Sequence, residues 1–66
     1  MSEELYKCEI VPRIFSSPDF AKRLGKRYPL RQFLAYHGYV KASISEKEMG
    51  EIASEYGCSI RRGGNP

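Results

Sequence analysis

Alternation of apolar and polar residues in three short stretches constrains this fold more than any other feature of the sequence. The stretches cover residues 5–11 ("LYKCEIV"), 39–44 ("YVKASI") and 58–62 ("CSIRR"). A period of two is typical of a strand that buries one of its faces. We therefore expect three strands, placed near the start, in the middle and near the end of the chain.

The segment between the first two stretches is predicted to contain two short helices. Ser17 suits the N-cap of the first helix, and Pro18 suits its first helical position. Pro29 disfavours one long helix and instead suits the start of a second, because it pushes the preceding residue out of the helical region. The second helix is expected to end at Gly38 and to bury a stripe formed by Leu30, Phe33, Leu34 and His37.

The segment after residue 44 carries the clearest helical pattern of the chain. Ser45 and Glu48 have the spacing of a capping box, in which each side chain bonds the backbone of the other residue. Gly57 is expected to end this helix. Apolar residues recur at helical spacing between these points: Met49, Ile52, Ala53 and Tyr56.

These elements predict a small α+β domain of the α/β class, formed by all of residues 1–66. The expected order is β-α-α-β-α-β, a three-stranded sheet with its helices on one face. Residues 39–62 are long enough for a crossover between two parallel strands. Residues 63–66 ("GGNP") are expected to form a flexible tail. The expected core consists of Ile10, Phe20, Leu24, Phe33, Leu34, Val40, Ile44, Ile52 and Ile60.

Charge is distributed unevenly along the chain. The net charge is +3, but residues 13–44 carry seven Lys or Arg against Asp19 alone. Residues 45–57 carry four Glu against Lys47. Such asymmetry indicates an anionic partner, or self-association between unlike patches.

The basic stretch, residues 20–33 ("FAKRLGKRYPLRQF"), is the strongest candidate for a binding surface. Five of its fourteen residues are Lys or Arg, and clustered cations of this kind contact phosphates. Tyr28, Tyr36 or Tyr39 would offer a stacking surface for unpaired bases. The simpler alternative is a charged outer face on two amphipathic helices. The predicted nucleic-acid-binding residues are Lys22, Arg23, Lys26, Arg27, Tyr28, Arg31, Arg61 and Arg62.

Other kinds of site have weaker support in the sequence. The Ala53-x-x-x-Gly57 spacing is found at the turn of helix-turn-helix proteins, but the glycines and proline after residue 62 cannot sustain the required second helix. Cys8, His37 and Cys58 lack the closely spaced ligand pair of a structural zinc site. We therefore expect no metal, no cofactor and no catalytic residues.

The preferred prediction is a small non-enzymatic protein that binds DNA or RNA through phosphate contacts, without strong base readout. The alternative is a protein-binding accessory or inhibitory module, such as a virus- or phage-encoded protein that acts on a larger partner. A homodimer is expected because a small sheet leaves strand edges unpaired. No apolar run is long enough to span a membrane, and we expect a cytoplasmic setting with Cys8 and Cys58 reduced.

Overall fold

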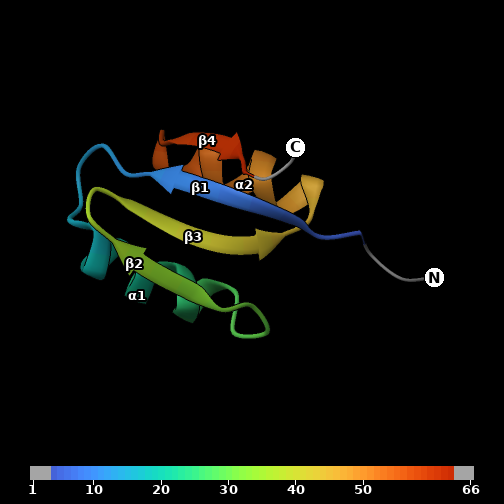
Figure 1. Cartoon of the computed structure of the whole chain (residues 1–66), viewed down its shortest axis with the longest axis horizontal. Helices are drawn as coiled ribbons and strands as arrows, with labels where there is room; N and C mark the ends of the chain where they lie inside the picture. The colour runs from blue at the N-terminus through green and yellow to red at the C-terminus, as the bar shows by residue number, and fades with distance from the viewer. Residues whose placement is uncertain (1–3, 64–66) are drawn as a thin grey trace.

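Two helices cover one face of a four-stranded sheet and leave the other face open (Figure 1). The computed structural model describes residues 4–63. Neighbouring strands are antiparallel, in the order β2-β3-β1-β4. This is the split-βαβ, ferredoxin-like arrangement. Along the chain the elements are β1 (Tyr6–Val11), α1 (Ser17–Arg27), β2 (Phe33–Tyr36), β3 (Tyr39–Ile44), α2 (Glu46–Tyr56) and β4 (Ser59–Arg62).

The α+β class is confirmed and the three expected strands are present, but the expected three-stranded sheet is wrong, because the sheet has four strands, and so is the expected second helix. Residues 33–36 form β2, so the order is β-α-β-β-α-β. Phe33 packs on the core, whereas Leu30, Leu34 and His37 are exposed, so no helical stripe is buried. So short a helix is marginal in water, whereas a strand gains a pairing partner in β3. Gly38, with φ of 87°, closes the turn between β2 and β3 rather than a helix.

The expected crossover between parallel strands over residues 39–62 is present, but the two strands are not neighbours in the sheet. β3 and β4 do run in the same direction, because each is antiparallel to β1. However, β1 lies between them and takes both sets of ladder hydrogen bonds. The crossover through α2 therefore skips one strand. The C-terminal strand also excludes a recognition helix after Gly57 within the described chain.

The helix ends follow the sequence signals closely. The N-cap of α1 is Ser16, one residue before the expected Ser17, and its Oγ accepts a hydrogen bond from the Asp19 backbone N–H. The capping box of Ser45 and Glu48 is present, and Gly57 ends α2 in the left-handed conformation. Gly63, the first residue of the expected tail, donates its backbone N–H to the Lys7 carbonyl at 2.7 Å. Residues 64–66 lie outside the described chain.

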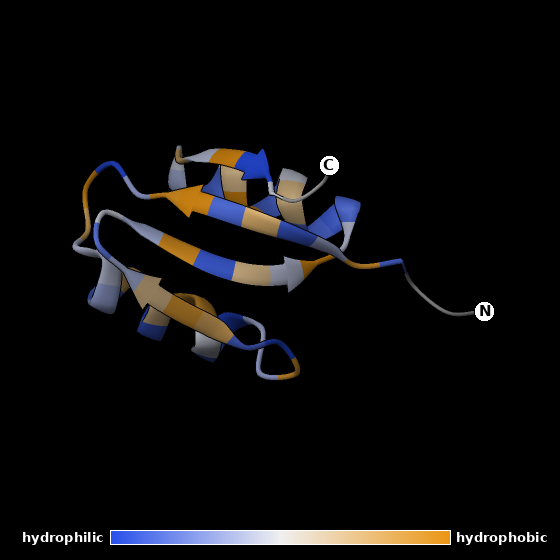
Figure 2. Cartoon of the chain, viewed as in Figure 1, coloured by the Kyte–Doolittle hydropathy of each residue, from blue (hydrophilic) through white to orange (hydrophobic). Residues whose placement is uncertain are grey.

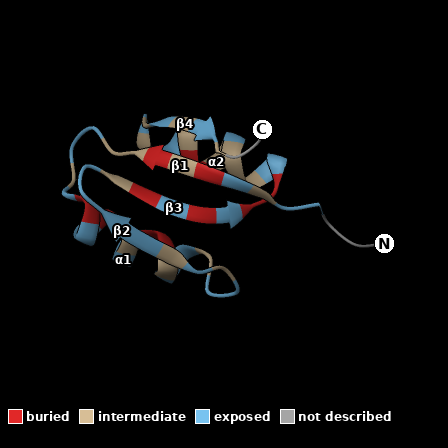
Figure 3. Ribbon diagram, viewed as in Figure 1, coloured by how far each residue is buried: buried red, intermediate tan, exposed pale blue. Residues whose placement is uncertain are grey.

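The core lies between the sheet and the two helices. Along β1 and β3 buried and more exposed residues alternate (Figure 3), so the buried side chains point toward the helices. Of the expected core residues, Phe33 and Ile60 are partly buried, whereas Leu34 is 47% exposed because it lies on the outer side of β2. The buried apolar residues are Cys8, Ile10, Phe20, Leu24, Val40, Ala42, Ile44 and Ile52.

Substitution of two expected core residues separates the buried position from the exposed one. Ile52 is fully buried on α2, so Ile52→Ala should lower the free energy of unfolding by about 2–5 kcal/mol. Leu34→Ala removes the same kind of side chain from the open face and should cost about 0.5 kcal/mol. Urea unfolding followed by circular dichroism measures both. Equal costs would contradict this assignment of the core.

Candidate functional site

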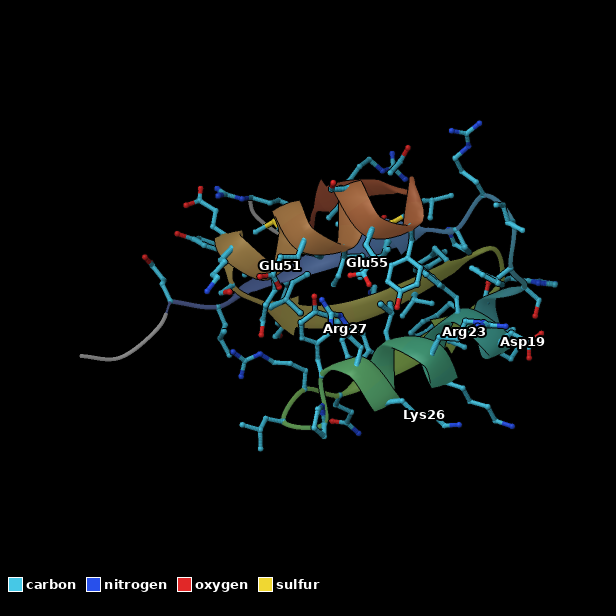
Figure 4. All side chains as sticks on the ribbon, turned by 180° about the vertical axis from the view of Figure 1, so that it is seen from behind. Asp19, Arg23, Lys26, Arg27, Glu51 and Glu55 are labelled. Carbon is cyan, nitrogen blue, oxygen red and sulfur yellow. The ribbon has the colours of Figure 1, made fainter. Side chains whose placement is uncertain are left out.

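The basic stretch meets the acidic side of α2 within the same chain. Figure 4 shows Arg27 between the two helices, with Glu51 and Glu55 on the side of α2 that faces α1. The three α2 carboxylates involved are spaced by three and four residues, so they share one face of the helix. The contacts are Arg27–Glu55 at 3.1 Å, Tyr28 Oη–Glu51 at 3.0 Å and Arg31 Nε–Glu48 at 2.9 Å.

The contact between Arg31 and Glu48 is the most buried of the three. The two side chains are only 17% and 15% exposed, and Glu48 Oε1 also accepts the Ser45 backbone N–H at 3.0 Å. Partial burial alone would raise the pKa of Glu48, but the hydrogen bonds from Arg31 and Ser45 outweigh it and lower that pKa. The carboxylate is therefore held ionised by its partners. Arg27 and Glu55 are about half exposed, and their ion pair is correspondingly weaker.

The remaining predicted cations do not gather on one surface. The Arg23 guanidinium lies 4.3 Å from the centre of the Phe15 ring. Within residues 4–63, neither Lys22 nor Lys26 forms an ion pair, and Figure 4 shows Lys26 pointing away from α2. Among the eight predicted residues, Lys22 and Lys26 are thus the two whose charge has no carboxylate or aromatic partner in the described part of the chain.

Arg61 and Arg62 lie on opposite faces of β4. Arg61 is paired with Glu9 on the open face, at 3.4 Å. Arg62 lies on the helix side, bonded to Glu46 at 2.8 Å and placed 4.1 Å from the centre of the Tyr6 ring. Arg61 is therefore the only one of the eight predicted residues that the structure places on the open face within β1–β4.

The open face carries a second candidate surface. Residues that alternate with the buried core positions project from it in rows across the strands, as the pairing register shows. Figures 2 and 3 show that β2 is mostly apolar and largely exposed, and the pairing register places its exposed Leu34 and Tyr36 on this side. The strand residues of the open face are Lys7, Glu9, Val11, Leu34, Tyr36, Tyr39, Lys41, Ser43, Ser59 and Arg61.

A pair of tyrosines, Tyr36 exposed and Tyr39 half-buried, marks one end of this face. Tyr36 ends β2 and Tyr39 begins β3, so the two-residue turn between them places the side chains directly opposite each other. Their rings are stacked, with centres 5.3 Å apart and planes inclined by 7°. Tyr36 is 45% exposed. The Lys41 ammonium lies 5.4 Å from the centre of the Tyr36 ring.

A hollow of about 620 Å³ occupies the part of the open face farther from the tyrosines. Leu5, Leu30 and Leu34 line it, and these leucines are 44%, 91% and 47% exposed. Lys7 and Lys41 also line the hollow, and neither forms an ion pair within the described part of the chain. The open face therefore combines apolar, aromatic and cationic groups that no helix covers.

The two cysteines are poor candidates for chemistry at neutral pH. Burial raises the pKa of Cys8 and of Cys58, so both thiols are protonated and weakly nucleophilic. Both are free. Over residues 4–63, no three His, Cys, Asp or Glu side chains are grouped so as to hold a metal ion. In the same range no helix is long and apolar enough to cross a membrane.

Lys7 and Lys41 are candidate site residues that the sequence prediction did not include. The alternation of apolar and polar residues could have identified them. In residues 39–44, for example, it places Lys41 on the same side as Tyr39, opposite the core. The sequence prediction did not include these lysines because it did not include strand β2. A helix over residues 30–37 would have buried Leu34 instead of placing it on this face.

The chain matches no family model, no curated protein and no solved structure. Its ferredoxin-like topology is shared by proteins with unrelated functions, so the topology alone assigns none. The function therefore has to be inferred from the chemistry of the open face and of α1.

The ionised state of Glu48 predicts a pH-dependent stability. Glu48→Gln removes the charge next to Arg31 but keeps an oxygen for the Ser45 N–H, and should cost about 1–2 kcal/mol at neutral pH. A lowered pKa stabilises the fold above the unfolded-state pKa, and this stabilisation is lost as the pH falls through the folded-state value. The difference between wild type and variant should therefore shrink at low pH.

The matched control for this prediction is Glu46→Gln, which breaks the exposed ion pair with Arg62. That pair lies in solvent and should contribute about 0.5 kcal/mol or less. Chemical unfolding between neutral pH and pH near 2 measures both variants. A cost for Glu48→Gln that is independent of pH would contradict the role assigned to its charge.

Proposed function

We propose that this protein binds nucleic acid without catalysing a reaction, mainly through phosphate contacts on the open face of the sheet. The supporting observation is that Lys7, Lys41 and Arg61 lie together on the face that the helices leave uncovered. Glu9 is the one carboxylate among the strand residues of this face. Cations on such a surface displace the counterions of the phosphate backbone, and this release provides sequence-independent affinity.

The alternative surface for the same function is the outer side of α1. Arg27 and Arg31 are already paired with α2 carboxylates, and phosphate binding there would have to compete with Glu55 and Glu48. Lys22 and Lys26 remain as cations of α1 without a carboxylate partner in the described chain. Two lysines on each side of the molecule thus offer a direct comparison of the two surfaces.

Removal of two lysine charges from each surface tests the proposal. The double variant Lys7→Gln, Lys41→Gln should weaken oligonucleotide binding about tenfold at low salt and make the slope of log affinity against log salt shallower by about 1.4 for single strands. The double variant Lys22→Gln, Lys26→Gln removes the same charge from α1 and should have a much smaller effect. Glutamine avoids a new acid next to Glu9, and all four lysines are exposed.

Fluorescence anisotropy with labelled single-stranded and duplex oligonucleotides at low and moderate salt provides the measurement. Circular dichroism confirms that each variant is folded. Affinity weaker than about 100 μM at low salt for every oligonucleotide would overturn the proposed function. A loss of oligonucleotide affinity seen only in the α1 variant would show that the binding site lies on the basic stretch instead.

The leucine-lined hollow supports a second candidate function, the binding of a larger protein. Leu30 is 91% exposed, and with Leu5 and Leu34 it forms an apolar surface next to two lysines. Soluble domains seldom leave such surfaces uncovered unless a partner binds them. The complementary occupant is a segment of a partner protein with apolar anchors and neighbouring carboxylates.

An anionic apolar dye reports whether this hollow binds such chemistry. Anilinonaphthalene sulfonate combines aromatic rings with one negative charge, so its fluorescence should rise in the presence of the folded protein. Leu30→Ser with Leu34→Ser should abolish most of that rise, whereas the double lysine variant of α1 should leave it intact. No dye binding by the folded wild type would argue against this second function.

Self-association and a cytoplasmic setting complete the proposal. β2 and β4 lie at the two edges of the sheet, and unpaired edges favour pairing with another chain. The opposite charges of residues 13–44 and 45–57 give less support for self-association than expected, because Arg27 and Arg31 already pair with carboxylates of α2. Sedimentation at tens of micromolar should show a species about twice the 7.6 kDa chain.

A further inference from the structure

We propose that the open face selects unpaired nucleotides, with the stacked pair of Tyr36 and Tyr39 as the platform on which a base stacks. This inference rests on the proposed function, because it names the class of nucleic acid that the same site takes. Base–aromatic stacking requires a flat ring that an unpaired base can reach face to face. Tyr36 is such an exposed ring at one end of the open face, and the half-buried Tyr39 supports it by stacking on it.

The geometry of the tyrosine pair is fixed by the backbone. Tyr36 and Tyr39 are directly opposed in the pairing of β2 with β3, and only His37 and Gly38 separate them along the chain. The rings are nearly parallel and close enough to restrict each other. A platform held in this way loses little conformational freedom when a base stacks on it, which favours binding.

Lys41 connects the platform with the phosphate contacts. It lies on the same side of β3 as Tyr39, two residues farther along, and its ammonium is placed over the Tyr36 ring. Its side chain is long and flexible, so the ammonium can move to a phosphate while a base takes its place over the ring. Release of this exposed cation–π contact costs less free energy than one stacked base contributes.

The rows of the sheet provide a path for a single strand. The tyrosines occupy one row, Lys41 and Glu9 the next, and Lys7 with Ser43 the one after. Same-side positions along a strand are about 7 Å apart, so these rows extend over about 14 Å. Glu9 is held by Arg61, and this pairing reduces its repulsion of a phosphate bound at Lys41.

Duplex nucleic acid cannot use this platform. In a duplex each base face is covered by its neighbours, and only base edges are presented in the grooves. Both helices lie on the other face of the sheet, so within residues 4–63 no helix projects from this side to enter a groove. Duplex binding should therefore involve the lysines alone, whereas a single strand gains the stacking contribution as well.

The test compares oligothymidylate of about ten nucleotides with a mixed-sequence duplex of equal length at the same salt concentration. Wild type should bind the single strand at least about tenfold more tightly than the duplex. Tyr36→Leu keeps an apolar side chain but removes the ring, and should weaken single-strand binding about tenfold to a hundredfold while duplex binding stays unchanged. Tyr36→Phe keeps the ring face and should bind like wild type.

The possible outcomes separate this inference from the proposed function. Equal affinity for both oligonucleotides, or wild-type binding by folded Tyr36→Leu, would overturn the stacking platform but leave phosphate binding in place. Loss of binding in both Tyr36→Leu and Tyr36→Phe would also overturn it, since the ring face is retained in the second variant. Absence of binding to either oligonucleotide would overturn both proposals.

Discussion

Pairing between the basic stretch and the acidic side of α2 determines which surfaces of this protein remain available. Glu48, Glu51 and Glu55 hold Arg31, Tyr28 and Arg27, so the opposite charges that the sequence keeps apart are joined where the helices meet. Both helices bury Phe20, Leu24 and Ile52 against one face of the sheet. The other face carries Lys7 and Lys41, which form no ion pair within residues 4–63. Carboxylates of the same chain thus neutralise part of the excess positive charge of residues 13–44.

The sequence was sufficient to predict the elements that depend on local signals. The capping box of Ser45 and Glu48, the end of α2 at Gly57 and the alternating strands follow from neighbouring residues. It did not predict β2, because four residues that alternate only weakly become a strand through pairing with β3. Insertion of β1 between β3 and β4 is likewise a long-range choice that no local pattern specifies.

The sequence predicted the residue types of the candidate site better than their location in the structure. Clustered cations with nearby tyrosines were the expected signature, and such a combination exists on the open face at Lys41, Tyr36 and Tyr39. The sequence could not show that Arg27 and Arg31 would be paired with the α2 carboxylates Glu55 and Glu48. Charge counted along the chain does not distinguish a surface that binds a partner from one that binds another helix.

Chemical-shift mapping of the folded protein with oligothymidylate tests the location of the binding surface most directly. The account predicts that the largest amide shifts in ¹⁵N-labelled protein fall on residues 34–43 and around Lys7, with small shifts along α1. Shifts centred on Lys22 and Lys26, with the open face unchanged, would contradict it.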